Sequence, residues 1–113
     1  MLFRSAADAE YATEYPVTVN DAAEAEFALQ TVTEVFGAGR GERAEFPITG
    51  AEDFSFVLNE VPGAFVFLGA CPPDRDPESA PTNHSALALF DDAALAEGTA
   101  LYAELALRRL AAG

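Results

Sequence analysis

Apolar residues recur along the chain at two spacings, one typical of helices and the other typical of strands. From residue 21 to residue 36 they recur every three or four positions, so they gather on one face of a helix. Asp21 followed by Glu24 resembles a capping box at the start of this helix, and Gly37 is a suitable residue to end it. The apolar face consists of Ala25, Ala28, Leu29, Val32 and Phe36.

Two further helices are predicted by the same reasoning. Thr49 and Glu52 form a second capping-box pattern ahead of apolar residues at helical spacing, which predicts a helix over residues 51–60. A Pro-Gly pair ends it. An Asp-Asp pair precedes a long segment that is apolar around nearly its whole circumference, which predicts a last helix over residues 93–112. Arg108 and Arg109 lie in its last turn, where positive charge favourably faces the helix dipole.

Three segments have the composition of strands. Residues 11–19 alternate aromatic and β-branched side chains, and residues 43–48 form a shorter candidate. Residues 64–69 are apolar at every position except the last glycine, which is typical of a strand buried on both faces. Because strands and helices alternate, we expect an α/β fold with a mixed sheet and flanking helices. The buried strand needs neighbours that this chain hardly supplies, so we expect part of a larger domain.

The long loop that follows the buried strand is the first candidate site. Residues 71–84 are rich in Pro, Asp and Ser, and loops that leave the end of a buried strand often carry function. His84, the only histidine, ends this loop. A single loop histidine is more often a solvated residue than a metal ligand, and one imidazole does not make a metal site.

The start of the helix at residues 51–60 is the second candidate site. Glu52 and Asp53 are adjacent carboxylates at this helix N-terminus, where negative charge is stabilised, so capping is their simplest role. With Gly50 permitting close backbone approach, the same N-terminus could present N–H groups to a substrate carboxylate. The two roles are compatible.

Composition excludes several classes of function. The 113 residues include 19 acidic and six basic side chains, a net charge of −13, so a phosphate backbone would be repelled and we expect no nucleic acid partner. No apolar run reaches the length of a membrane span, and Cys71 is the only cysteine, so we expect a cytoplasmic protein without a disulfide. No catalytic triad, phosphate loop or dinucleotide-binding motif is present.

Five motifs in order along the chain resemble the C-terminal part of the metal-dependent amidohydrolases, in the hippurate hydrolase and N-acyl-amino-acid amidohydrolase group of the aminoacylase and carboxypeptidase superfamily. They are Tyr-Pro-Val-Thr-Val-Asn-Asp at 15–21, Gly-Ala-Glu-Asp-Phe-Ser-Phe at 50–56, Val-Pro-Gly-Ala-Phe-Val-Phe-Leu-Gly at 61–69, Asn-His-Ser at 83–85 and Phe-Asp-Asp-Ala-Ala-Leu at 90–95. The resemblance covers nearly the whole chain from about residue 11.

The resemblance implies a site and a domain boundary. It implies a two-metal centre, with Zn, Mn, Co or Ni, that activates water to cleave the amide bond of an N-acyl amino acid or peptide-like substrate. His84 matches the last metal ligand, and Gly50, Glu52 and Asp53 fall beside the active site. Residues 1–18 would be the tail of a lid or dimerisation domain that ends in its last strand. Residues 19–113 would be the C-terminal part of a zinc-peptidase-like catalytic domain.

This chain departs from the family pattern at two places. The proline that usually follows the His-Ser or His-Asn pair is replaced by Ala86. The family's other ligands, a Cys-x-His motif and a Glu-Glu pair that includes the general base, lie upstream of the matched part, so no catalytic residue is assigned here. We expect a C-terminal fragment that is inactive alone and completed by the missing N-terminal half.

Two alternatives stay open at this point. The chain could be a non-catalytic remnant or partner-binding subunit that keeps the fold without hydrolase activity. It could also associate with itself through residues 11–19 and its exposed apolar faces, because a half domain leaves sheet edges unpaired.

Overall fold

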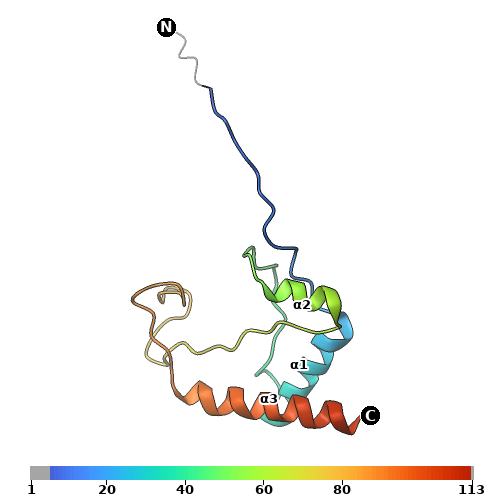
Figure 1. Cartoon of the computed structure of the whole chain (residues 1–113). Coiled ribbons are helices and arrows are strands. Elements are labelled where there is room, and N and C mark those ends of the chain that lie inside the picture. The colour runs from blue at the N-terminus through green and yellow to red at the C-terminus, as the bar shows by residue number, and fades with distance from the viewer. Residues whose placement is uncertain (1–5, 113) are drawn as a thin grey trace.

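The computed structural model describes residues 6–112, and the regular structure of this part consists of three helices. Helix α1 spans Ala22–Phe36, α2 spans Phe54–Glu60 and α3 spans Ala93–Ala111. In Figure 1, α3 lies along one side of the molecule, α2 lies on the opposite side, and α1 runs between them. No helix in these residues combines the length and apolarity that crossing a membrane requires. Residues 1–5 and 113, at the ends of the two expected domains, lie outside the described residues.

The ends of α1 and α3 lie where the sequence predicts them. The Asp21 carboxylate accepts hydrogen bonds from two backbone N–H groups in the first turn of α1, at 2.9 and 3.0 Å. Gly37 ends α1 with a φ of 104°, a conformation that glycine adopts without steric cost, and its N–H donates to the Thr33 carbonyl. Asp91 accepts a hydrogen bond from the Ala93 N–H at the start of α3, at 2.9 Å. Both predicted helices are therefore confirmed.

The expected mixed sheet is wrong, because residues 6–112 contain no strand. Residues 11–19, 43–48 and 64–69 have the composition of strands, but none of them pairs with another backbone segment in a ladder. Residues 6–19 instead form an extended tail whose N-terminal part points away from the helices (Figure 1). Strand composition describes which side chains suit a pleated surface, whereas a strand exists only where a second backbone accepts its hydrogen bonds.

A side chain takes the place that a neighbouring strand would occupy beside residues 64–69. The Phe65 N–H donates to Asn20 Oδ1 at 2.8 Å, and Asn20 Nδ2 donates to the Phe65 carbonyl at 3.0 Å. The Asp21 N–H also donates to the Gly63 carbonyl at 2.9 Å. A carboxamide has the same donor and acceptor groups as a peptide unit, so Asn20 satisfies both backbone groups of Phe65. We call residues 64–69 the extended segment. These bonds fix it to the N-terminus of α1.

Aromatic contacts hold α2 against the extended segment and the tail. The Phe54 and Phe65 ring centroids lie 5.8 Å apart, and the Phe65 and Phe67 rings meet edge to face at 5.2 Å. Tyr15 of the tail meets Phe56 of α2 edge to face at 6.0 Å. Such pairs add modestly to the apolar area that they bury.

Ion pairs connect the two longer helices. Arg108 of α3 donates hydrogen bonds to Glu34 of α1 and to Glu104 of its own helix, and Arg109 pairs with Glu24 of α1. The hydrogen bond from Arg108 holds the pKa of Glu34 below its ordinary range, and the same bond raises the pKa of Arg108. Because these side chains are only partly buried, each pair contributes little to stability.

The chain buries little apolar surface. Ala28, Thr31 and Ser55 are the only buried residues among those described. A compact monomer of 11.9 kDa would expose about 5,900 Å², whereas this chain exposes 9775 Å². Its radius of gyration is 19.1 Å, compared with about 13 Å for a compact domain of this length. Phe67 and Tyr102 are 70% and 81% exposed. The helices therefore enclose almost no apolar core.

The hydrogen bonds of Asn20 generate a stability prediction. We expect Asn20→Ala to lower the free energy of unfolding by about 1–2 kcal/mol, since two hydrogen bonds are lost and both backbone groups of Phe65 lose their partner. Urea denaturation followed by circular dichroism measures the change. Asn59→Ala is the matched control, because Asn59 is an exposed residue of α2. Equal stability of the Asn20→Ala variant and the wild type would show that these bonds do not hold the segment.

Candidate functional site

The loop between the extended segment and α3 is closed at its base. The Asp91 N–H donates to the Ala70 carbonyl at 2.9 Å, which joins the two ends of residues 70–91. Inside the loop, short turns succeed one another, including a bond from the Ala80 N–H to the Asp76 carbonyl at 2.9 Å. The loop thus has adjacent ends and its own internal contacts. Its predicted lack of helix and strand over residues 71–84 is confirmed.

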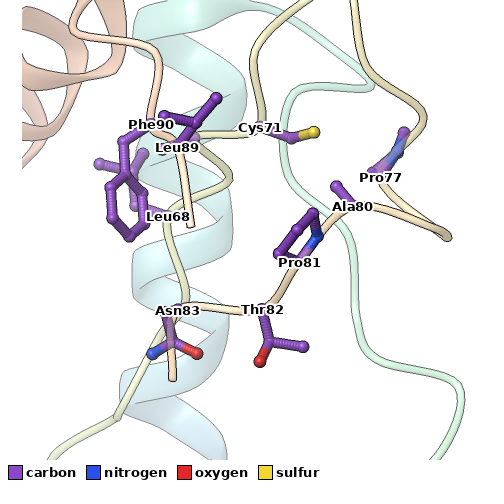
Figure 2. Close-up of a pocket in the computed structure, with 10 residues that line it drawn as sticks. Leu68, Cys71, Pro77, Ala80, Pro81, Thr82, Asn83, Leu89 and Phe90 are labelled. Carbon is purple, nitrogen blue, oxygen red and sulfur yellow. The ribbon is translucent and has the colours of Figure 1, made fainter. Parts of the chain in front are cut away.

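Residues of this loop and its base line a pocket of about 200 Å³ that is open to solvent, which we call the loop pocket. Figure 2 shows Leu68, Leu89 and Phe90 on one side of it and Cys71, Pro77 and Pro81 on the other. Thr82 and Asn83 lie at its lower edge in this view (Figure 2). The complete lining is Leu68, Ala70, Cys71, Pro77, Ala80, Pro81, Thr82, Asn83, Leu89 and Phe90, and none of these residues is charged.

His84 follows directly after the pocket residue Asn83 and is exposed to solvent. It lies in a turn in which the Ser85 N–H donates to the Thr82 carbonyl at 2.9 Å. Ser85 Oγ then accepts a hydrogen bond from the Leu87 N–H at 3.1 Å. Ser85 therefore fixes the turn that presents His84, without the proline that the family pattern has at residue 86.

The second candidate site begins three residues later than predicted. Helix α2 starts at Phe54 rather than at residue 51, and no hydrogen bond from Thr49 caps it within the described residues. Glu52 caps it instead, because its Oε1 accepts the Phe54 N–H at 3.1 Å and its carbonyl accepts the Ser55 hydroxyl at 2.6 Å. Glu52 therefore bonds the start of α2 from the residue before the N-cap Asp53, and the capping box expected from Thr49 and Glu52 is wrong.

The other two residues of this candidate site make little contact. Asp53 is exposed, and its side chain makes no capping hydrogen bond. A Cβ added at Gly50 would meet nothing within 4 Å, so packing in this chain does not demand a glycine there.

The structure does not bring the two candidate sites together. No hydrogen bond or ion pair among residues 6–112 joins His84 to Gly50, Glu52 or Asp53. Figure 1 shows α2 and the loop at opposite ends of the extended segment. Among the described residues, no group of three His, Cys, Asp or Glu side chains could hold a metal ion. A hydrolytic zinc centre needs three protein ligands, so these residues alone do not fit one.

Sequence reasoning missed the loop pocket. It depends on the hydrogen bond between Ala70 and Asp91, which are 21 positions apart, and on Leu68 and Phe90 lying on the same side. Periodicity carries no information about such a closure. The high proline content of residues 72–81 is the feature of the sequence that indicates a rigid loop there, because the proline ring fixes φ.

The capping contact of Glu52 generates a prediction that separates capping from substrate binding. We expect Glu52→Ala to lower the free energy of unfolding by about 0.5–2 kcal/mol, as for other lost helix caps. Asp53→Ala is the matched control and should leave the stability nearly unchanged, since its side chain makes no capping bond. Thermal denaturation measures both variants. If the two lose the same stability, Glu52 is not the cap.

Comparison with known proteins identifies the family. The profile of peptidase family M20/M25/M40 matches residues 6–108. IAA-amino acid hydrolase ILR1-like 4 of Arabidopsis thaliana is 33% identical over 96 residues, which are 85% of this chain and 21% of that protein. Hippurate hydrolase of Campylobacter jejuni is 32% identical over 95 residues, which are 84% of this chain and 23% of that protein.

The chain thus spans about a fifth of the length of the curated relatives that it matches. No solved structure matches it significantly. Because the family profile covers nearly all of the described residues and the resemblance seen in the motifs agrees with it, the chain belongs to peptidase family M20/M25/M40.

Proposed function

We propose that this chain is the C-terminal part of a metal-dependent amidohydrolase that cleaves the amide bond of an N-acyl amino acid or a small peptide. The observation that carries the proposal is the match to family M20/M25/M40 over residues 6–108. Two relatives named as hydrolases of an IAA-amino acid and of hippurate, which is benzoylglycine, support this substrate class. The chain covers only 21% and 23% of them, so we propose that it acts together with further M20 polypeptide.

The family is generally metal-dependent, and a divalent metal would supply an activated water to the amide carbonyl. The described residues of this chain do not by themselves fit such a centre, since no three candidate ligands lie together. We therefore assign no step of hydrolysis to this chain. We propose that His84 offers one imidazole, whose exposure on a turn fixed by Ser85 leaves it open to a centre completed by residues outside this segment.

We further propose that residues 1–18 belong to a lid domain and residues 19–113 to the catalytic domain. The change in contacts near residue 20 supports this boundary. Residues 6–19 form a tail without regular structure, whereas Asn20 and Asp21 are hydrogen-bonded to Phe65 and Gly63. Gly50, Glu52 and Asp53 are proposed as substrate-binding residues, with Glu52 also serving as the cap of α2.

A non-catalytic subunit is the second candidate function. The absence of three gathered ligands in residues 6–112 favours it, as does the exposed apolar surface, which a binding partner could cover. This candidate predicts complex formation without hydrolysis.

Complementation tests the proposed function. C. jejuni hippurate hydrolase without its matched part is mixed with the full chain and Zn²⁺ or Mn²⁺, and release of glycine from benzoylglycine is measured. We expect hydrolysis only when both polypeptides and the metal are present. His84→Ala should reduce the rate to that of the mixture without this chain, because a ligand is lost.

Glu60→Gln is the matched control for complementation, since Glu60 is an exposed residue at the end of α2. It should hydrolyse as fast as the wild type. Equal rates for His84→Ala and the wild type would contradict the role of His84. Formation of a complex with no hydrolysis under any metal condition would favour the non-catalytic subunit.

A further inference from the structure

We propose that two copies of this chain associate through antiparallel pairing of their extended segments, residues 64–69, and form a closed dimer. The partner is a second copy of the same chain, and backbone hydrogen bonds make the contact. This inference concerns the chain by itself and does not depend on its proposed part in hydrolysis.

One edge of the extended segment is occupied, and the other is free. Asn20 bonds the N–H and the carbonyl of Phe65, at 2.8 and 3.0 Å. Backbone groups of successive residues in an extended chain point to opposite edges, so those of Ala64, Val66 and Leu68 point away from Asn20. These groups make no hydrogen bond within residues 6–112. An edge of this kind is a template for pairing with another chain.

The side chains of the extended segment are exposed and uncharged. Val66, Phe67 and Leu68 are 51%, 70% and 52% exposed. Residues 61–73 form the longest stretch of the sequence without a charged side chain. Two copies that each carry a net charge of −13 repel one another, and like charges that lie opposite one another destabilise strand pairs. A second copy therefore meets the least repulsion at this segment.

The free edge suits the two-fold symmetry of a dimer. With the symmetry axis at Val66, the two Val66 residues lie opposite one another, and Ala64 of each copy lies opposite Leu68 of the other. All three residues then fall in hydrogen-bonded pairs, in which each residue both donates to and accepts from its partner. The same patch on both copies is used, which is the arrangement of a closed two-fold interface.

The surroundings of the segment limit the assembly to two copies. Asn20 occupies the second edge in each copy, so no third chain finds a free edge there. Pro62 and Pro72 flank the segment and have no N–H to donate, so a ladder cannot extend past them. The pairing therefore closes as a dimer instead of growing into a fibre.

The tail is a poorer surface for self-association. Residues 11–19 also have the composition of a strand, but they include Glu14 and Pro16. A charge and a proline on an edge strand both oppose pairing with another chain. The extended segment has neither.

Sedimentation velocity of the full chain over a range of concentrations tests the proposal. We expect a monomer–dimer equilibrium that shifts toward dimer when NaCl is raised, because salt screens the repulsion between the two acidic copies. Val66→Lys should raise the dimer dissociation constant about tenfold or more, because it places two like charges opposite one another at the axis. Val66→Thr keeps a β-branched residue at the axis and should retain the dimer.

Tyr102→Lys is the matched control. It makes the same change in net charge at an exposed residue of α3, and Tyr102 is 81% exposed. This variant should dimerise at least as well as the wild type, since each copy carries one negative charge less. Circular dichroism verifies that both lysine variants keep the helices.

Amide hydrogen exchange places the contact. Protection of the Val66 and Leu68 N–H groups should rise with protein concentration, because these groups gain partners only in the dimer. The Phe65 N–H is bonded to Asn20 in the monomer already, so its protection should not depend on concentration.

Three results would overturn the proposal. The first is a chain that stays monomeric at every concentration and salt level. The second is a dimer that Val66→Lys and Tyr102→Lys affect equally, or assemblies larger than a dimer. The third is protection of Val66 and Leu68 that arises only after truncated C. jejuni hippurate hydrolase is added, which would assign this edge to further M20 polypeptide.

Discussion

The structure depends on one constraint, which is that the chain carries far more apolar surface than it can bury within itself. Half of its residues are hydrophobic, yet its three helices meet mainly where α1 contacts α3. Burial of apolar surface is the main force that stabilises folded proteins, so little of that force is available here. Polar contacts accordingly define the arrangement: Asn20 fixes the extended segment, and Arg108 and Arg109 connect α3 to α1.

The same constraint explains which sequence predictions succeeded. Helices α1 and α3 were predictable because their signals are local: Asp21 bonds the first turn of α1 directly, and Gly37 adopts the positive φ that ends it. The start of α2 was misplaced because Thr49 and Glu52 have the spacing of a capping box, but Glu52 alone bonds the helix. A pattern of residue types cannot tell which of two capping residues makes the bond.

The strands were not predictable, because pairing is a property of two segments. Residues 64–69 read as a strand buried on both faces, but Phe67 is 70% exposed and Phe65 is bonded by a side chain. The loop was predictable as a loop from its proline and acidic residues. The loop pocket was not, since it depends on the contact between Ala70 and Asp91 across the loop.

Family membership and the open structure together lead to the view that the apolar faces of this chain are completed by further M20 polypeptide. The most direct measurement is sedimentation velocity of the chain alone and mixed with C. jejuni hippurate hydrolase that lacks the matched part. We predict a one-to-one complex in the mixture, in which the exposed apolar residues of the chain become covered. A chain that stays a cooperatively folded monomer at every concentration, and that sediments independently of the second polypeptide, would contradict this view.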